Sequence, residues 1–166
     1  MFRTILVATD LTSQSASALV HAREFGRIFD SELIVAHVVP MPTALKNWKA
    51  AVFRDDLKAY REVLARQRSS ADDALNRQVS SIGLVSANRV RCVVRAGDPA
   101  AQLAEMIEEL GVDLTIVGRG RGGKVGPVTE RLVRLVGKAI LVTPVRPSKL
   151  VATGRTNRRI SRRAAA

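Results

Sequence analysis

The sequence has few of the residues on which several classes of protein depend. It contains a single cysteine, Cys92, among 166 residues, so it can form neither an internal disulfide nor a cysteine-rich metal site. Its longest apolar runs, 34–39 and 139–142, fall far short of the roughly 18 to 20 residues that span a bilayer. These absences exclude a disulfide-stapled domain and predict a protein without membrane spans.

The beginning of the sequence lacks the features of a secretory signal. Met1 to Arg3 lead into a short β-like run that ends at Asp10, with no apolar h-region and no small-residue cleavage site. A lone cysteine also fits a reducing compartment. We therefore expect a cytoplasmic protein.

Acidic residues are missing from the C-terminal segment, which concentrates the positive charge of the chain. The segment 146–166 accounts for +7 of the formal net charge of +12 and leaves +5 for the rest. Such a segment could hold nucleic acid or another polyanion electrostatically. Aromatic residues make up only 4 % of the chain, so platforms for base stacking are few. We expect one domain over 1–145, followed by a basic, disordered tail over 146–166, and a solvated extension is favoured over a nucleic-acid arm.

Strand-like and helix-like patterns alternate along the chain. Short apolar or alternating runs predict strands, and apolar residues three or four positions apart predict helices. The strands are expected at 4–8, 33–39, 89–95, 112–117 and 139–142, and the helices at about 13–29, 57–82, 99–110 and 128–136. This alternation predicts an α/β fold, a doubly wound parallel sheet with helices on both faces.

Two predicted helices carry recognisable start signals. Thr12 and Ser13 offer an N-cap for the first helix. Asp98 followed by Pro99 is a capping residue before a proline at the first helical position. On the strand before that second helix, Cys92 alternates with valines, which predicts that it points into the core as a small hydrophobe.

A glycine-rich loop over 118–126 follows one predicted buried strand and precedes a helix. In this context backbone amides and the helix dipole can hold a phosphate group. The alternative is a basic surface loop that binds nothing, because glycine-rich turns are common. Neither the Walker A pattern nor the dinucleotide fingerprint fits the segment.

No catalytic or metal-binding set is evident elsewhere. Asp10, at the end of the first strand, could bind a ligand or the backbone of its own turn. His21 and His37 lack the partners that a nucleophilic site requires. The adjacent aspartates at 55–56 and 72–73 point in different directions on a helix and do not share a metal easily.

Several segments together resemble the universal stress protein family over nearly all of 1–145. They are 5–10, 37–39, 97–99, 112–114 and 126–131. The resemblance implies a five-stranded parallel sheet in the order 3-2-1-4-5, a homodimer, no strong enzymatic activity and, in one branch, bound ATP. It also implies that Asp10 and Val38 contact adenine and ribose, and that Gly118 is the first glycine of the phosphate motif.

The loop departs from the motif of the ATP-binding branch. Seven residues separate Gly118 from Gly126, fewer than in the family motif, and Pro127 stands where the motif has serine or threonine. Proline supplies neither a hydroxyl nor an amide donor. Thr129 is the nearest residue that could supply a hydroxyl instead.

Three hypotheses on function follow. The first is a non-enzymatic stress-response module that binds ATP, another adenine nucleotide or another phosphate-bearing ligand. The second is a family member that has lost ATP binding and acts through protein partners as a dimer formed by the strand Ala139 to Val142. The third is polyanion binding by the basic tail. The residues expected around the nucleotide are Asp10, Val38, Gly118, Gly120, Gly123, Gly126 and Thr129.

Overall fold

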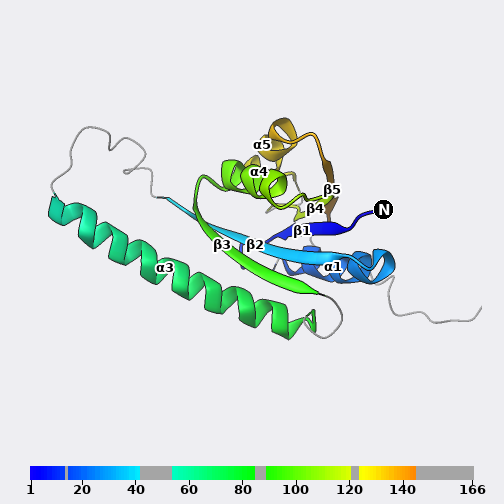
Figure 1. The fold of residues 1–166 in the computed structure, drawn as a ribbon, viewed down its shortest axis with the longest axis horizontal. Helices are drawn as coiled ribbons and strands as arrows, with labels where there is room; N and C mark the ends of the chain where they lie inside the picture. Colours follow the sequence, from blue (N-terminus) through cyan, green and yellow to red (C-terminus); the bar gives the residue numbers. More distant parts are fainter. Residues whose placement is uncertain (14, 42–53, 85–88, 121–123, 145–166) are drawn as a thin grey trace, which may run out of the picture.

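The computed structural model describes residues 1–13, 15–41, 54–84, 89–120 and 124–144. These residues form one five-stranded sheet in which every neighbouring pair is parallel (Figure 1). The strand order is β3-β2-β1-β4-β5, which confirms the predicted order 3-2-1-4-5. The strands are β1 (Thr4–Ala8), β2 (Glu32–Pro40), β3 (Val90–Gly97), β4 (Leu114–Gly118) and β5 (Ala139–Thr143), and the helices are α1 (Ala16–Phe29), α3 (Arg54–Ser81), α4 (Pro99–Glu109) and α5 (Pro127–Leu135).

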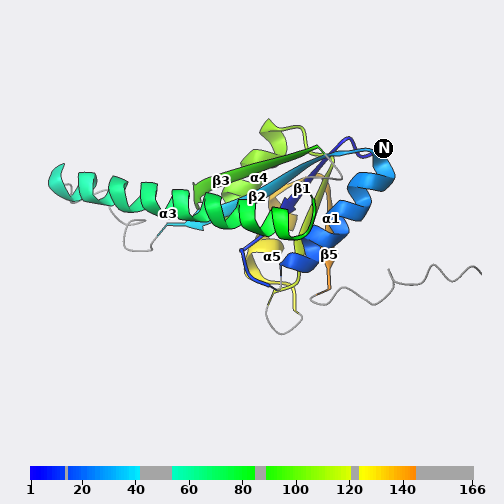
Figure 2. The same cartoon turned by 90° about the horizontal axis from the view of Figure 1, so that it is seen from below.

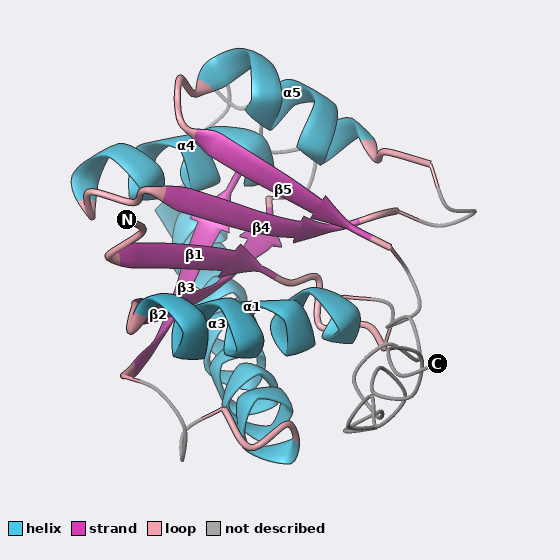
Figure 3. Cartoon of the chain, turned by 90° about the vertical axis from the view of Figure 1, so that its right-hand side faces the viewer, coloured by secondary structure: helices cyan, strands magenta, loops and turns pink. Residues whose placement is uncertain are grey.

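Helices cover both faces of this sheet (Figure 3). Side chains of a strand alternate between the two faces, so Ile5 and Val7 of β1 pack in one cluster with α1 and α3. Leu6, between them, packs in a second cluster with α4 and α5. The central strands β1, β2 and β4 are buried on both faces, which explains why their sequences are almost continuously apolar.

Helix α3 is longer than the sheet that it covers. Its C-terminal half is anchored by Ala71, Leu75 and Val79, all of them buried. Over 61–70, by contrast, every side chain except that of Leu64 is exposed, and the helix extends well past the strands (Figure 2). The charged and polar sequence of the stretch 61–70 agrees with its exposure to solvent.

The start of α1 differs from the sequence prediction. The helix begins at Ala16, with Ser15 as N-cap, so the prediction of a cap at Thr12 or Ser13 was wrong. The hydroxyl of Thr12 instead donates to Asp10 Oδ1 at 2.6 Å. Leu11 lies in the left-handed region with φ of 63°. The helix therefore begins three residues later than the sequence pattern predicted.

The second helical start and the lone cysteine agree with expectation. Asp98 is the N-cap of α4 and accepts a hydrogen bond from Ala101 N at 3.1 Å, and Pro99 is the first helical residue. Cys92 is half-buried against the cluster that contains α1 and α3. Burial raises the pKa of the Cys92 thiol, which agrees with a hydrophobic role. None of the described helices is long and apolar enough to cross a membrane.

Asp113 joins the beginnings of the two central strands β1 and β4. Its Oδ2 accepts hydrogen bonds from Thr4 N at 3.0 Å and Arg3 N at 2.8 Å, and these bonds lower the pKa of Asp113. A lowered pKa stabilises the fold at pH values above the ordinary aspartate pKa, about 3.9, and this contribution is lost as the pH falls through the folded-state pKa.

Replacing Asp113 with alanine should therefore lower the free energy of unfolding at pH 7 and should have less effect at pH 2. Urea unfolding at both pH values measures this difference. Asp73→Ala is the matched control, because Asp73 is an exposed aspartate on α3 and its loss should change little at either pH. An equal effect of Asp113→Ala at both pH values would contradict the role of its carboxylate.

Candidate functional site

A cavity of about 420 Å³ lies at the carboxyl edge of the sheet, where β1, β2 and β4 end. This edge includes the point at which the strand order reverses between β1 and its neighbours, the usual ligand position in doubly wound sheets. The volume falls within the range of small-molecule sites. The lining residues are Ala8, Thr9, Asp10, Ser15, Ala36, His37, Val38, Pro40, Pro99, Leu103, Val117, Gly118, Arg119, Gly120, Gly126, Pro127, Val128 and Thr129.

The fold brings most of the residues expected around a nucleotide to this one cavity. They come from β1, from β2, from the loop after β4 and from the first turn of α5, which are far apart in the sequence. Gly123 lies outside the described residues. The residues that do line the cavity are Asp10, Val38, Gly118, Gly120, Gly126 and Thr129.

Asp10 shapes its own turn and also faces the cavity. Its Oδ1 accepts hydrogen bonds from Thr12 N at 3.0 Å and Thr12 Oγ1 at 2.6 Å. Burial alone would raise the pKa of Asp10, but these hydrogen bonds bring it below its ordinary value. The side chain is therefore an ionised acceptor at neutral pH. The predicted bond to its own turn is confirmed, and the binding of a ligand by Asp10 stays a prediction.

The loop that carries Asp10 is held by a network of side chains. Thr9 Oγ1 lies 2.7 Å from Ser15 Oγ, donates to Gln78 Oε1 at 2.9 Å and accepts from Leu11 N at 3.0 Å. Gln78, on α3, also donates to Thr12 O at 3.2 Å. A non-glycine residue with positive φ, such as Leu11, persists only where its surroundings fix it. This network preorganises the rim of the cavity.

His37 also lines the cavity, although no ligand role was predicted for it. Its Nδ1 lies 2.8 Å from Thr9 O, and because a carbonyl oxygen only accepts, Nδ1 is the donor. In the neutral ring Nε2 is then left as an acceptor. The sequence signal that could have located His37 is its place at the end of β2, next to Val38.

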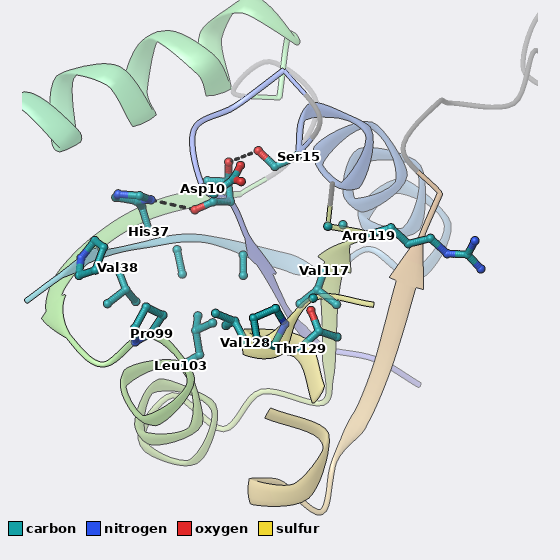
Figure 4. A pocket seen from close by; sticks show the side chains of 18 residues that line it. Asp10, Ser15, His37, Val38, Pro99, Leu103, Val117, Arg119, Val128 and Thr129 are labelled. Atoms are coloured by element: carbon teal, nitrogen blue, oxygen red, sulfur yellow. Dashed lines mark hydrogen bonds between the residues drawn. The ribbon is translucent and has the colours of Figure 1, made fainter. Parts of the chain in front are cut away.

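One end of the cavity is apolar. Val38, Pro99 and Leu103 lie together on one side of the view, with His37 next to Val38 and Asp10 above them, while Arg119 and Thr129 lie on the other side (Figure 4). Pro99 and Leu103 belong to the first turns of α4, where the sequence predicted only a capping residue and a helix. Sequence reasoning missed them because their role depends on α4 crossing over the end of β2.

The position of α4 relative to α5 is fixed by a charged hydrogen bond. Asp98, the cap of α4, accepts from Arg131 Nη1 of α5 at 2.8 Å. Pro99 and Thr129, which line the cavity, lie one and two residues from this pair. The pair therefore holds the two helix starts together at the mouth of the site.

The glycine loop is closed at its base. Gly120 N donates to Lys124 O at 3.0 Å. A Cβ atom on Gly120 would lie 3.3 Å from the Cα of Gly126, a contact tighter than side chains normally make. The two glycines permit this approach of backbone to backbone, which is why glycine is required at 120.

Within the described residues, no group of three or more histidine, cysteine, aspartate or glutamate side chains is arranged to hold a metal ion. The cavity is lined by an aspartate, a histidine, an arginine, two hydroxyl residues near β1 and one on α5 among mostly apolar neighbours. This composition suits an organic ligand with a flat apolar part and a few polar groups.

The fold and the cavity define a doubly wound α/β protein with a cavity at its switch point. The model of the universal stress protein family matches residues 1–144, and the chain belongs to that family. No curated protein sequence is significantly similar to it.

Solved structures support the same fold. Hypothetical protein MJ0577 shares 22 % identity at a TM-score of 0.71, over 86 % of this chain and 96 % of that one. A universal stress protein in complex with cAMP shares 18 % identity at a TM-score of 0.60, over 87 % of this chain and 98 % of that one. A universal stress protein from Archaeoglobus fulgidus in complex with dAMP shares 16 % identity at a TM-score of 0.52, over 84 % of this chain and 96 % of that one. At these identities the likeness shows the fold alone.

Proposed function

We propose that this protein binds an adenine nucleotide reversibly in the switch-point cavity and acts as a non-enzymatic stress-response module. The observation that carries the proposal is the division of one cavity into an apolar end and a hydrogen-bonding end. A nucleotide has the same division, since its base is flat and largely apolar on its faces while its sugar and phosphate require polar partners. Family membership and the lone cysteine favour a cytoplasmic setting.

The apolar end is the proposed position of the base. Val38 and Leu103 are almost fully buried, at 7 % and 4 % exposure, and Pro99 lies beside them (Figure 4). Between such side chains a base gains mainly by leaving water. Asp10, ionised and facing the same cavity, is the proposed acceptor for a ribose hydroxyl.

Two of the structural neighbours hold ligands of this class, namely cAMP in one and dAMP in the other. Both contain adenine, a sugar and one phosphate group. This supports an adenine nucleotide as the ligand class to test first.

The proposal of binding without catalysis is based on the hydrogen bonds of the lining side chains. Ser15 Oγ is shared between Thr9 Oγ1 and Thr12 O, at 2.7 and 2.9 Å. The Nδ1 of His37 is directed at a backbone carbonyl. Among the described contacts no hydroxyl or thiol bonds the His37 ring, and the hydroxyl that donates to Asp10, that of Thr12, closes the turn that carries Asp10. A nucleophile paired with a base and aimed at a ligand is the arrangement that nucleophilic catalysis needs.

The test is the nucleotide content and affinity of the full chain. The protein is purified natively and denatured, and any released nucleotide is identified by mass spectrometry. Protein stripped of ligand is then titrated calorimetrically with AMP. Binding of AMP at close to one per chain supports the proposal. Empty protein that also ignores millimolar AMP, cyclic AMP and ATP would refute it.

We further infer that the chain forms a homodimer through β5. This strand is an edge of the sheet, and its Ile140, Leu141 and Val142 are only partly buried. On the preceding helix Val133 and Leu135 are each 54 % exposed. An unpaired edge flanked by apolar side chains favours pairing with a second copy about a twofold axis.

A charge near this edge should separate the dimer. Leu135→Lys should convert the sedimenting species from twice the chain mass to the chain mass at micromolar concentration, because a lysine at the interface is not solvated there. Val63→Lys is the control, since Val63 is a similarly exposed apolar residue, at 52 %, on α3, and it should leave the dimer intact. A wild-type chain that sediments as a monomer would exclude the interface.

A further inference from the structure

We propose that Gln78, on helix α3, positions the carboxylate of Asp10 for its ligand. This inference rests on the proposed function, in which Asp10 accepts a hydrogen bond from a ribose hydroxyl, and it names a residue outside the lining of the cavity that holds this acceptor in place. It is based on two hydrogen bonds made by one side chain, on the strained turn that they join and on the anchoring of α3.

The amide of Gln78 bonds the loop on both sides of Asp10. Its Oε1 accepts from Thr9 Oγ1 at 2.9 Å, and its Nε2 donates to Thr12 O at 3.2 Å. A backbone carbonyl only accepts, so Nε2 must face Thr12 O, and this leaves Oε1 for the hydroxyl of Thr9. Both ends of the amide are therefore used, one residue before Asp10 and two residues after it.

The turn that carries Asp10 is strained and needs support. Leu11 has a φ of 63°, a conformation that costs free energy for a residue with a side chain and persists only where the surroundings fix it. Its N–H donates to Thr9 Oγ1 at 3.0 Å, and this oxygen in turn donates to Gln78. The support that Thr9 gives to the turn thus depends on an oxygen whose position Gln78 helps to set.

Gln78 also ties the far side of the turn to a distant part of the chain. Thr9 is tied to β2, because its N–H donates to Ala36 O at 2.9 Å. The local hydrogen bonds that the structure describes for residues 10–12 join them to one another or to residues 9–15. The bond from Gln78 spans 66 residues, and it is the described hydrogen bond that holds this stretch from another element.

Helix α3 gives Gln78 a rigid support. Leu75 and Val79, on the same helical turn, are 0 % and 1 % exposed and belong to the cluster that α3 forms with α1 and the sheet. The side chain of Leu11 packs against this cluster as well. Side chains on packed helices hold a site more precisely than side chains on loops do. The turn is therefore fixed from β2 by Thr9 and from α3 by Gln78.

Asp10 requires this support because a hydrogen bond to a ligand depends steeply on distance and angle. A turn that adopts the binding conformation for only part of the time binds its ligand with an affinity reduced by that fraction. Two neutral hydrogen bonds of ordinary strength change such a population by about tenfold. Gln78 does not line the cavity, so it acts through Asp10 and not by contact with the ligand.

The experiment is a calorimetric titration of the full chain with AMP and with AMP that lacks both ribose hydroxyls. Wild-type protein should prefer ordinary AMP. Gln78→Met keeps the length of the side chain and removes both bonds, so it should reduce this preference by about tenfold and leave the binding of the second ligand unchanged. Gln67→Met is the matched control, because Gln67 is an exposed glutamine on the same helix, and it should keep the wild-type preference.

Gln78→Glu provides a second variant with the same shape. It keeps an acceptor for Thr9 but turns a second acceptor toward Thr12 O in place of the donor, so it too should lose the preference. Its added charge acts equally on the two ligands, which carry the same phosphate group, and cancels in the ratio of their affinities. Unfolded chains lower the binding stoichiometry and not this ratio, so a loss of stability alone does not produce the expected result.

The outcomes separate this inference from the function on which it rests. A preference for ordinary AMP that survives in both Gln78 variants would overturn the positioning role and leave nucleotide binding in place. Equal affinity of the wild-type protein for the two ligands would show that Asp10 receives no bond from the ribose, and the inference would then be wrong although a nucleotide site remains. If the wild-type protein binds neither ligand, the proposed function fails and the inference fails with it.

Discussion

Replacing Asp10 with alanine should weaken the binding of AMP by about ten- to hundredfold. The carboxylate is ionised and faces the cavity, and a hydrogen bond from a ribose hydroxyl to a charged acceptor contributes about 1.5 to 3 kcal/mol. The same substitution removes the bonds from Thr12 N and Thr12 Oγ1 that hold the turn. Both losses act in the same direction, and calorimetric titration measures their sum.

Two comparisons separate the contact with ligand from the support of the turn. Asp10→Asn keeps an oxygen that can accept from Thr12 but removes the charge, so it should weaken AMP binding less than alanine does. The second comparison uses AMP that lacks both ribose hydroxyls. Wild-type protein should prefer ordinary AMP, and Asp10→Ala should show no preference. A preference that survives in Asp10→Ala would mean that another residue binds the ribose.

The strands and one of the helix starts could be predicted from the sequence because they depend on local patterns. Buried parallel strands must be apolar on both faces, so runs such as Ile5 to Val7 stand out. Asp98 followed by Pro99 is a helix-start signal that depends only on residues next to one another in the sequence. The family resemblance then supplied the sheet order, which local patterns alone do not determine.

The cavity could be predicted only in part, because its walls meet through space. Asp10 and Gly118 follow strands directly, and the switch-point rule therefore finds them. Pro99 and Leu103 belong to a helix start, and His37 projects from the other face of β2 than Val38. Pro99 and Leu103 have no sequence signal for ligand contact, and the signal for His37 is no more than its place next to Val38. Their part in the site became evident only once α4 was placed over β2.

The two largest differences from expectation both arise in turns. The left-handed conformation of Leu11 shifts the start of α1 to Ala16, and it is stabilised by hydrogen bonds from neighbours rather than by the identity of Leu11 itself. The approach of Gly120 to Gly126 is likewise a contact across a loop. Residue-by-residue propensities do not register such contacts, although they decide which amides remain available to a ligand.

The placement of α5 should matter more for nucleotide binding than the overall stability of the fold. Leu132 is fully buried and packs α5 against the cluster that contains Leu6 and α4. Leu132→Ala should lower the free energy of unfolding by about 2 to 5 kcal/mol. It should also weaken AMP binding about tenfold, because Thr129 lies one turn earlier on the same helix and requires its position to be held within a fraction of an ångström.

Leu33→Ala is the matched control for this prediction. Leu33 is also a fully buried leucine, but it lies near the amino end of β2, at the opposite edge of the sheet from the cavity. Its loss should reduce stability by a similar amount and leave AMP affinity unchanged in the folded protein. Urea unfolding and calorimetric titration measure the two quantities separately. Equal weakening of AMP binding in both variants would show that affinity follows global stability, and the expected role of α5 as a separately positioned wall of the nucleotide cavity would then be wrong.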